Sequence, residues 1–222
     1  MGLNISKGNM YEFVTHTWNT VKGKCPHDCS YCYMKRWGNL KDTRFDLSEL
    51  KTDLGIGNFI FVGSSCDMFA QTIPYIWIFE TLDHCNHFSK NQYLFQTKNP
   101  YRITELLPII MDLEPIICTT IESNRWYPEI MADSPSIENR INAMRLITEF
   151  RKFVTIEPIL DFDIETLVEM IKKVDPEQVN IGADSGGHNL PEPSYQKIMD
   201  LAAELSKFTS VANKSNLNRL KK

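Results

Sequence analysis

Residues 115–121 have the sequence PIICTTI, a run without a charged side chain in which five of the seven residues are β-branched. Residues 58–64, NFIFVGS, have a similar character. Short, nearly continuous apolar runs are typical of strands that are buried on both faces. These two stretches therefore indicate the interior of a parallel β-sheet.

Strands and helices alternate outward from these stretches along the whole chain. Strands are expected at residues 12–18, 58–64, 92–97, 115–121, 152–158 and 178–183. Helices are expected at residues 74–88, 100–113, 136–150, 163–174 and 194–208. Such alternation predicts a parallel sheet with right-handed crossovers. The expected fold class is α/β, with a parallel sheet and the helices outside. Six such units can form a partial (β/α)6 barrel or a doubly wound sheet, whereas a closed eight-unit barrel needs about 250 residues.

The composition is that of an ordinary soluble domain, with 42% hydrophobic and 23% charged residues. We expect a single domain over residues 1–222, with a core at about 12–208 and a basic C-terminal tail at about 209–222. No apolar run approaches the roughly 20 residues that cross a bilayer, and no secretory signal is recognised. We therefore expect a cytoplasmic protein with reduced thiols and no membrane partner.

Basic residues are concentrated in two places, although the net charge is −4. Residues 22–44 contain six basic and two acidic side chains, and residues 206–222 contain five basic and no acidic ones. Such patches on an acidic body attract phosphates or an acidic electron-transfer partner. A solvated face and a frayed tail are the alternative interpretation.

The most specific motif is the cysteine loop at residues 25–33, CPHDCSYCY. Cys25, Cys29 and Cys32 have the spacing C-x3-C-x2-C, with Tyr31 just before the third thiol. Three thiolates this close can bind three irons of a [4Fe-4S] cluster and leave the fourth open, where S-adenosylmethionine (SAM) can chelate. The alternatives are a zinc site, completed by His27 or a distant ligand, and three unliganded cysteines.

This motif resembles that of the radical SAM superfamily. A narrower resemblance is to the small phage- and prophage-associated radical SAM proteins of the Gp37/Gp68-like group. The stretches that carry it are, in order, Trp18-Asn19, the cysteine loop, residues 61–69 (FVGSSCDMF), Thr97-Lys98, residues 121–123 (IES), Arg140-Ile141, residues 155–160 (TIEPIL) and residues 182–186 (GADSG). The chain departs from the family in its short loop without a preceding Pro and in the part after Gly187, where the match is poor.

The resemblance implies a six-unit partial barrel in which the three cysteines ligate the cluster and Tyr31 lies against the adenine of SAM. It also implies that the backbone of Gly63, Ser64 and Ser65 faces the amino group of SAM, because small residues allow a close approach.

Further candidates follow the other expected strands, because chemistry in parallel α/β folds gathers at the carboxyl ends of the strands. We expect cofactor-binding roles for Asp67, Glu122, Arg140, Glu157 and Asp184, and catalytic roles for Lys98 and Cys66. Lys98 could hold the SAM carboxylate or a phosphate, and Cys66 could donate a hydrogen atom. The structural alternatives are a helix cap for Asp67, an ion pair between Glu122 and Arg140, a surface lysine and a packed thiol.

Together these features predict an enzyme in which a reduced [4Fe-4S] cluster cleaves SAM to methionine and a 5′-deoxyadenosyl radical. The radical abstracts hydrogen from a substrate, and a flavodoxin- or ferredoxin-type electron donor is implied. The basic patches and the phage association favour a nucleic acid or nucleotide as the substrate, for modification or repair. The alternative is a non-enzymatic zinc-binding module with a regulatory or nucleic-acid-binding role.

Overall fold

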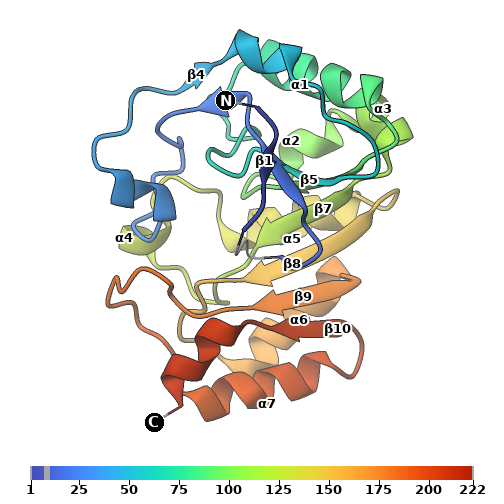
Figure 1. The fold of residues 1–222 in the computed structure, drawn as a ribbon. Helices are drawn as coiled ribbons and strands as arrows, with labels where there is room; N and C mark the ends of the chain where they lie inside the picture. The colour runs from blue at the N-terminus through green and yellow to red at the C-terminus, as the bar shows by residue number, and fades with distance from the viewer. Residues whose placement is uncertain (1, 8–10, 222) are drawn as a thin grey trace.

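The fold is built on one eight-stranded sheet, seen in a computed structural model that describes residues 2–7 and 11–221 (Figure 1). The order across the sheet is β1 (Asn4–Ile5), β2 (His16–Trp18), β5 (Phe59–Val62), β6 (Gln92–Gln96), β7 (Ile116–Thr120), β8 (Arg151–Ile156), β9 (Gln178–Ile181) and β10 (Ser210–Asn213). β1 is antiparallel to β2, and all other neighbours pair in parallel. The sheet is open, with β1 and β10 at its edges.

All six strands expected from the sequence are present close to their predicted positions, and they lie side by side in chain order. β7, which contains most of the PIICTTI run, is buried at every residue. This pattern arises because a central parallel strand has covered faces on both sides. The predicted α/β class with a parallel sheet is therefore confirmed.

The two faces of the sheet are covered in different ways. On one face, strand residues such as Ile117 and Val154 pack against the helices in the large hydrophobic core. On the other face, Cys118 and Phe153 pack with Tyr11 in a smaller core. Since successive side chains of a strand point to opposite faces, neighbours in sequence belong to different cores. The N-terminal segment thus covers the face that the helices leave open.

The helices follow the strands on the outer face. They are α1 (Tyr75–His87), α2 (Tyr101–Thr104), α3 (Leu107–Ile110), α4 (Pro128–Met131), α5 (Ile137–Leu146), α6 (Ile164–Val174) and α7 (Tyr195–Leu205). The short 3-10 helices are η1 (Tyr33–Trp37), η2 (Leu47–Lys51), η3 (Met111–Leu113) and η4 (Ser215–Leu220), and β3 (Val21–Lys22) pairs with β4 (Arg44–Phe45) in a separate small sheet. Ser136 and Ser194 cap α5 and α7 by accepting backbone hydrogen bonds of 3.2 and 3.3 Å.

The helix expected at residues 100–113 is divided into α2, α3 and η3. Pro108 lies in the first turn of α3. Proline has no amide hydrogen to donate to the carbonyl four residues earlier, and its ring clashes with that carbonyl. α2 accordingly ends at Thr104, and a single continuous helix is not possible here.

The basic tail expected at about 209–222 is instead part of the fold. β10 pairs in parallel with β9, and η4 follows it with Leu217 buried. The strand was not predicted because its sequence, SVAN, is too short and too polar to be distinguished from a loop. The sheet therefore has seven parallel strands rather than six.

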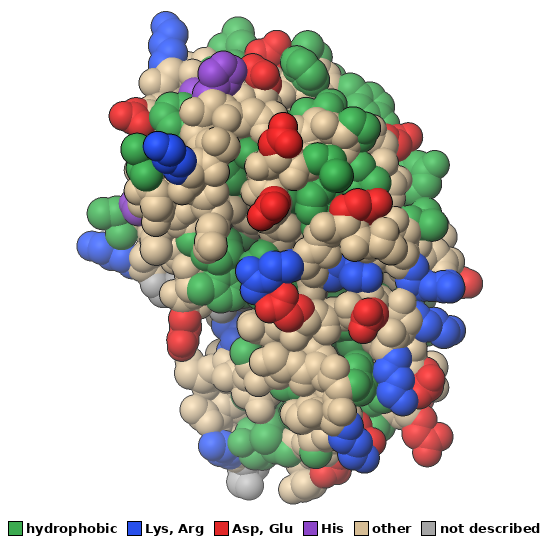
Figure 2. Space-filling view, turned by 90° about the vertical axis from the view of Figure 1, so that its right-hand side faces the viewer, with side chains coloured by type: hydrophobic (Ala, Val, Ile, Leu, Met, Phe, Trp, Pro, Cys, Tyr) green, Lys and Arg blue, Asp and Glu red, His purple; other side chains and the backbone are tan. Residues whose placement is uncertain are grey.

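The two ends of the sheet differ in what covers them. Figure 2 shows the end where the parallel strands begin, with hydrophobic side chains gathered in its upper part and charges of both signs mixed below. The carboxyl ends face the opposite side, where η1, α4 and the cysteine loop lie (Figure 1). Within the described residues, none of the helices combines the length and the apolar character needed to cross a bilayer.

Candidate active site

The cysteine loop lies at the carboxyl edge of the sheet, against the segment that contains α4. The Ser30 amide donates to the Ile130 carbonyl at 3.0 Å, and the Asp133 amide donates to the His27 carbonyl at 3.1 Å. Residues that follow β7 thus hold the loop by its backbone. This support matters because residues 23–32 contain no helix or strand of their own.

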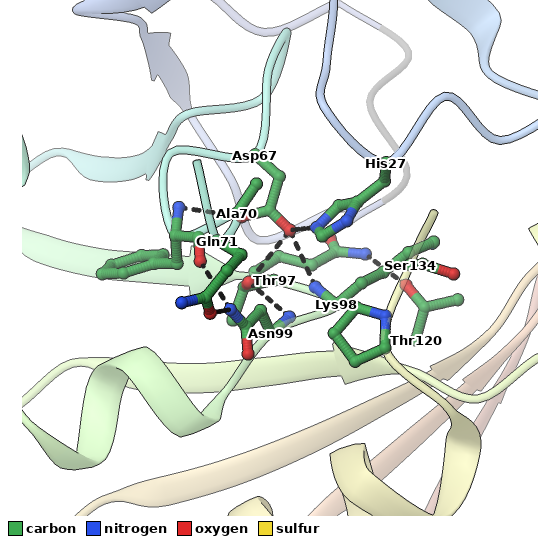
Figure 3. Close-up of polar contacts among 12 residues, drawn as sticks. His27, Asp67, Ala70, Gln71, Thr97, Lys98, Asn99, Thr120 and Ser134 are labelled. Atoms are coloured by element: carbon green, nitrogen blue, oxygen red, sulfur yellow. Dashed lines mark hydrogen bonds and ion pairs between the residues drawn. The ribbon is translucent and has the colours of Figure 1, made fainter. Parts of the chain in front are cut away.

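Asp67 ties the cysteine loop to the ends of β5 and β6 (Figure 3). Its Oδ2 lies 2.8 Å from His27 Nε2 and accepts from the Thr97 hydroxyl at 2.9 Å and the Lys98 amide at 2.8 Å. Its Oδ1 accepts from the Phe69 amide at 3.0 Å. Burial raises the pKa of Asp67, but His27 and the hydrogen bonds outweigh it and lower the pKa. The carboxylate is engaged within the protein, so it positions the loop.

The three thiols of the motif differ in their surroundings. Cys29 is buried, whereas Cys25 and Cys32 are partly exposed. A hydrogen bond from the buried Cys66 thiol lowers the pKa of Cys25 and raises that of Cys66. Burial raises the pKa of Cys29 and Cys32, and the positive charge of Lys98 opposes this rise. Cys25 therefore has the most thiolate character of the three.

The chemistry of this set of donors is compatible with an iron–sulfur cluster. Among residues 2–7 and 11–221, no three His, Cys, Asp or Glu side chains converge as the ligands of one ion must. Each cysteine of a cubane cluster bonds a different iron atom, so the thiols surround a larger body and need not converge. Three soft thiols on one loop, one with a lowered pKa, suit that role.

Glu122, two residues after the end of β7, is the centre of a second buried cluster. Arg140 Nη1 donates to its Oε2 at 2.8 Å, Lys98 Nζ lies 3.4 Å from its Oε1, and the Tyr31 hydroxyl donates to Oε1. Burial raises the pKa of Glu122, but the charges of Arg140 and Lys98 lower it to about 2. Lys98 Nζ also lies 5.3 Å from the centre of the Tyr31 ring. These contacts join the ends of β6 and β7 to the aromatic residue of the cysteine motif.

Arg140 has a protein partner at every nitrogen of its guanidinium. Nε donates to the Pro135 carbonyl at 2.8 Å, Nη2 donates to Ser134 Oγ at 2.7 Å, and Nη1 also donates to the Thr120 carbonyl at 2.9 Å. The ion pair with Glu122, which the sequence offered as the structural alternative, is present. Arg140 therefore orients Glu122, and each of its guanidinium nitrogens already donates to an acceptor of the protein.

The turn at residues 63–65 follows β5 directly. Gly63 has a φ of 78°, and a Cβ there would lie 3.3 Å from the Cys66 carbonyl oxygen, so glycine is favoured. Asn19 Oδ1 accepts from the Ser65 amide at 2.8 Å, and Asn19 Nδ2 donates to the Ser64 hydroxyl at 3.2 Å. Asn19, which stands directly after β2, thus holds the turn in place.

Glu157, directly after β8, is held by the C-terminal segment. Lys214 Nζ donates to its two carboxylate oxygens at 2.9 and 3.0 Å, and Asn216 Nδ2 donates to Oε1 at 3.0 Å. A Cβ on Gly182 would lie 2.6 Å from Glu157 Cδ, so a side chain there would displace the carboxylate. Glu157 therefore lies at the carboxyl end of the sheet, here called the mouth, with a lysine as its counterion.

The Asp184 carboxylate closes the loop that follows β9. It accepts from the Gly186 amide at 2.9 Å and the His188 amide at 2.5 Å, and its Oδ1 lies 2.7 Å from His188 Nδ1. Burial raises the pKa of Asp184, and these hydrogen bonds outweigh it and lower the pKa. Asp184 thus shapes its own loop rather than pointing freely into the mouth.

Three residues that complete the site were not among the candidates, namely Asn19, Lys214 and Asn216. Asn19 follows the first parallel strand, so the strand-end argument could have identified it. Lys214 and Asn216 follow β10, which no apolar pattern revealed. The role of His27 as the partner of Asp67 was also missed, because the two residues are 40 positions apart.

The fold is that of radical SAM enzymes. A spore photoproduct lyase mutant with bound AdoMet and dinucleoside spore photoproduct is similar over 96% of this chain and 80% of its own, with a TM-score of 0.69 and 10% identity. Streptococcus suis SuiB bound to precursor peptide SuiA is similar over 90% of this chain and 48% of its own, with a TM-score of 0.63 and 11% identity. For anSMEcpe with bound AdoMet and a peptide, the TM-score is 0.52 at 10% identity, over 88% of this chain and 62% of that one.

The chain belongs to the family described as "Protein of unknown function (DUF5131)", which matches residues 9–200. No curated protein matches it in sequence. The solved structures, at 10–11% identity, establish the shared fold alone.

Proposed function

We propose that this chain is a radical SAM enzyme that holds a [4Fe-4S] cluster on Cys25, Cys29 and Cys32. The observation that carries the proposal is the position of these thiols. They lie on one loop at the carboxyl edge of a parallel sheet, and Asp67 anchors that loop through His27. The bound AdoMet in structures of the same fold supports the proposal.

A cluster at this loop would supply one electron to SAM, whose C–S bond breaks to give methionine and a 5′-deoxyadenosyl radical that takes a hydrogen atom from the substrate. The residues of the chain bind and orient the reactants. The turn at Gly63, Ser64 and Ser65 offers backbone polar groups to the amino group of SAM. Lys98, beside Tyr31 and the thiols, offers a cation to its carboxylate.

The other residues at the mouth have supporting roles in this proposal. Tyr31 faces the adenine while Glu122 holds its hydroxyl. Glu157, paired with Lys214, is the candidate contact to the ribose or the substrate, and Asp184 holds the neighbouring loop in shape for that cofactor-binding role. Cys66, buried beside Cys25, is the candidate hydrogen-atom donor.

We further propose a flavodoxin- or ferredoxin-type electron donor, a cytoplasmic location and a nucleic acid or nucleotide substrate for modification or repair. Three of the six basic residues within 22–44, namely Arg36, Lys41 and Arg44, form no ion pair with the other described residues, and these three support an anionic partner. Structures of spore photoproduct lyase with the same fold contain a dinucleoside, whereas those of SuiB and anSMEcpe contain peptides, so the fold leaves the substrate open. Kinship with the phage-associated Gp37/Gp68-like group is part of this proposal and rests on the ordered motifs between Trp18 and Gly186.

The test is anaerobic reconstitution with iron and sulfide, then incubation with dithionite and SAM and chromatography for 5′-deoxyadenosine. We expect a brown protein that makes 5′-deoxyadenosine, and a Cys29→Ala variant that makes none. Cys85→Ala is the matched control, because that thiol is buried on α1 and is not part of the cysteine motif. A colourless protein with one equivalent of zinc and no 5′-deoxyadenosine would refute the proposal in favour of the binding module.

A further inference from the structure

A basic and aromatic surface lies beside the cysteine loop. η1 begins immediately after Cys32, and its residues Tyr33 and Trp37 are 49% and 67% exposed. Arg36 Cζ lies 5.6 Å from the centre of the Tyr33 ring and 5.1 Å from that of Trp37. Exposed aromatic side chains that lie together can form part of a binding surface. Their flat faces, held by a guanidinium, are suited to stacking.

A cavity of about 370 Å³ adjoins η1. Its lining includes Met34 of η1, the cations Lys41 and Arg44, and Asn19 and Ser65 of the turn at the end of β5. The volume lies within the range of about 300–1,000 Å³ that is typical of sites for small ligands. The cavity therefore adjoins both the basic surface and the mouth of the proposed active site.

The cations of this surface are available to an anion. Arg36, Lys41 and Arg44 form no ion pair with any carboxylate in the part of the chain that the structure describes. Lys22, the other cation at the cavity, already contacts two carboxylates at 2.5 and 2.7 Å. The unneutralised charges lie close together in sequence and line or flank one cavity, so they favour a partner with several negative charges.

We propose that the surface formed by η1 and residues 39–44 binds a single strand of nucleic acid. Phosphates contact Lys41 and Arg44, bases stack on Tyr33 and Trp37, and one nucleotide enters the cavity towards Ser65. This inference names the substrate class of the proposed radical SAM enzyme and rests on that proposed function. Exposed aromatic side chains among basic ones are the combination by which proteins hold single strands.

Two observations favour a single strand over other polyanionic partners. The stacking faces of Tyr33 and Trp37 need unpaired bases, which a duplex does not offer. An acidic protein would be attracted by the same charges but would not use a cavity of about 370 Å³. Binding of a duplex or of an acidic protein in place of a single strand would therefore count against the proposal.

The test is fluorescence anisotropy of a labelled 12-nucleotide single strand with the reconstituted full-length protein, at several salt concentrations. We expect Trp37→Ala to weaken binding by at least about fivefold, and Trp37→Phe to restore most of it, because one stacked base is lost and then regained. We expect Lys41→Gln/Arg44→Gln to reduce the salt slope of log K by about 1.4, because each phosphate contact contributes about 0.7.

The control is Lys172→Gln/Lys173→Gln, which removes the same charge from the end of α6. Binding that is lost equally in this control, a duplex that binds as tightly as the strand, or no binding at low salt would overturn the proposal. The same preparations are assayed for 5′-deoxyadenosine. Normal SAM cleavage without strand binding refutes only this inference, whereas strand binding without SAM cleavage refutes only the proposed enzyme.

Discussion

At the scale of single residues, the most consequential contact is that between Asp67 and His27. It joins the end of β5 to the middle of the cysteine loop, and Asp67 is also held by Thr97 and the Lys98 amide. Both side chains are nearly inaccessible, with exposed fractions of 5% for His27 and 10% for Asp67. Because hydrogen bonds to a buried carboxylate are strong, this residue fixes where the thiols lie.

We predict that Asp67→Asn lowers both stability and cluster retention. The amide cannot accept from all the donors that face Asp67, so we expect a loss of about 1–3 kcal/mol in the free energy of unfolding. Urea unfolding and the iron content after reconstitution measure the two effects. The exposed Asp112→Asn is the control. A variant with unchanged iron content would show that the loop is positioned without Asp67.

The ion pair of Glu122 and Arg140 predicts a specific pH dependence. The pKa of Glu122 is about 2 in the folded protein and about 4.3 when unfolded, so its charge stabilises the fold above the unfolded value. This contribution is lost as the pH falls from about 4.3 towards 2. Glu122→Gln leaves a buried cation and should cost about 3–5 kcal/mol at pH 7.

The difference between the wild-type chain and Glu122→Gln should therefore shrink below pH 4. Urea unfolding at a series of pH values measures it. The matched control is Glu138→Gln, an exposed carboxylate on the same helix as Arg140. A cost that stays constant down to pH 2 would mean that folding does not lower the pKa of Glu122.

At the scale of elements, the C-terminal strand and η4 decide the shape of the mouth. β10 covers the edge of β9, Lys214 and Asn216 contact Glu157, and Arg219 donates to the Asp184 carbonyl at 3.1 Å. The residues that follow β8 and β9 are thus held by the segment that the sequence pattern assigned to a tail.

We predict that a chain ending at residue 208 loses solubility, because the hydrogen-bonding edge of β9 and its buried residues become exposed. A chain ending at residue 220, which keeps β10 and η4, should behave as the full-length protein does. Size-exclusion chromatography and thermal unfolding compare the two. A monodisperse chain of 208 residues with an unchanged melting temperature would show that β9 does not need β10 to cover its edge.

At the scale of the whole molecule, the proposed cluster would lie where several segments of the sheet meet. The cysteine loop contacts the ends of β5 and β6 through Asp67, and it contacts the α4 segment through its backbone.

A group that binds only the folded chain stabilises it by mass action. We predict that reconstitution raises the melting temperature, and that removing the iron with a chelator reverses the rise. Cys29→Ala should show no rise, and a rise equal to that of the wild type would place the iron elsewhere.

Much of the fold was predictable because its signals are local. Apolar runs such as residues 58–64 and 115–121 mark buried strands within a few residues, and Ser136 marks a helix start by its own hydrogen bond. The prediction of one helix at residues 100–113 was wrong only where Pro108 interrupts it. β10 could not be found, because its pairing with β9 and not its own polarity makes it a strand.

The sequence by itself determined the order of six strands, the placement of the candidate residues at strand ends and the spacing of the three thiols. Only the tertiary structure decided which partner each of those residues has. Asp67 meets His27 across 40 residues, and Glu157 meets Lys214 across 57. A carboxylate can pair with many cations, and its own neighbours in sequence do not choose among them. The choice is made when parallel strands bring distant loops to one edge of the sheet.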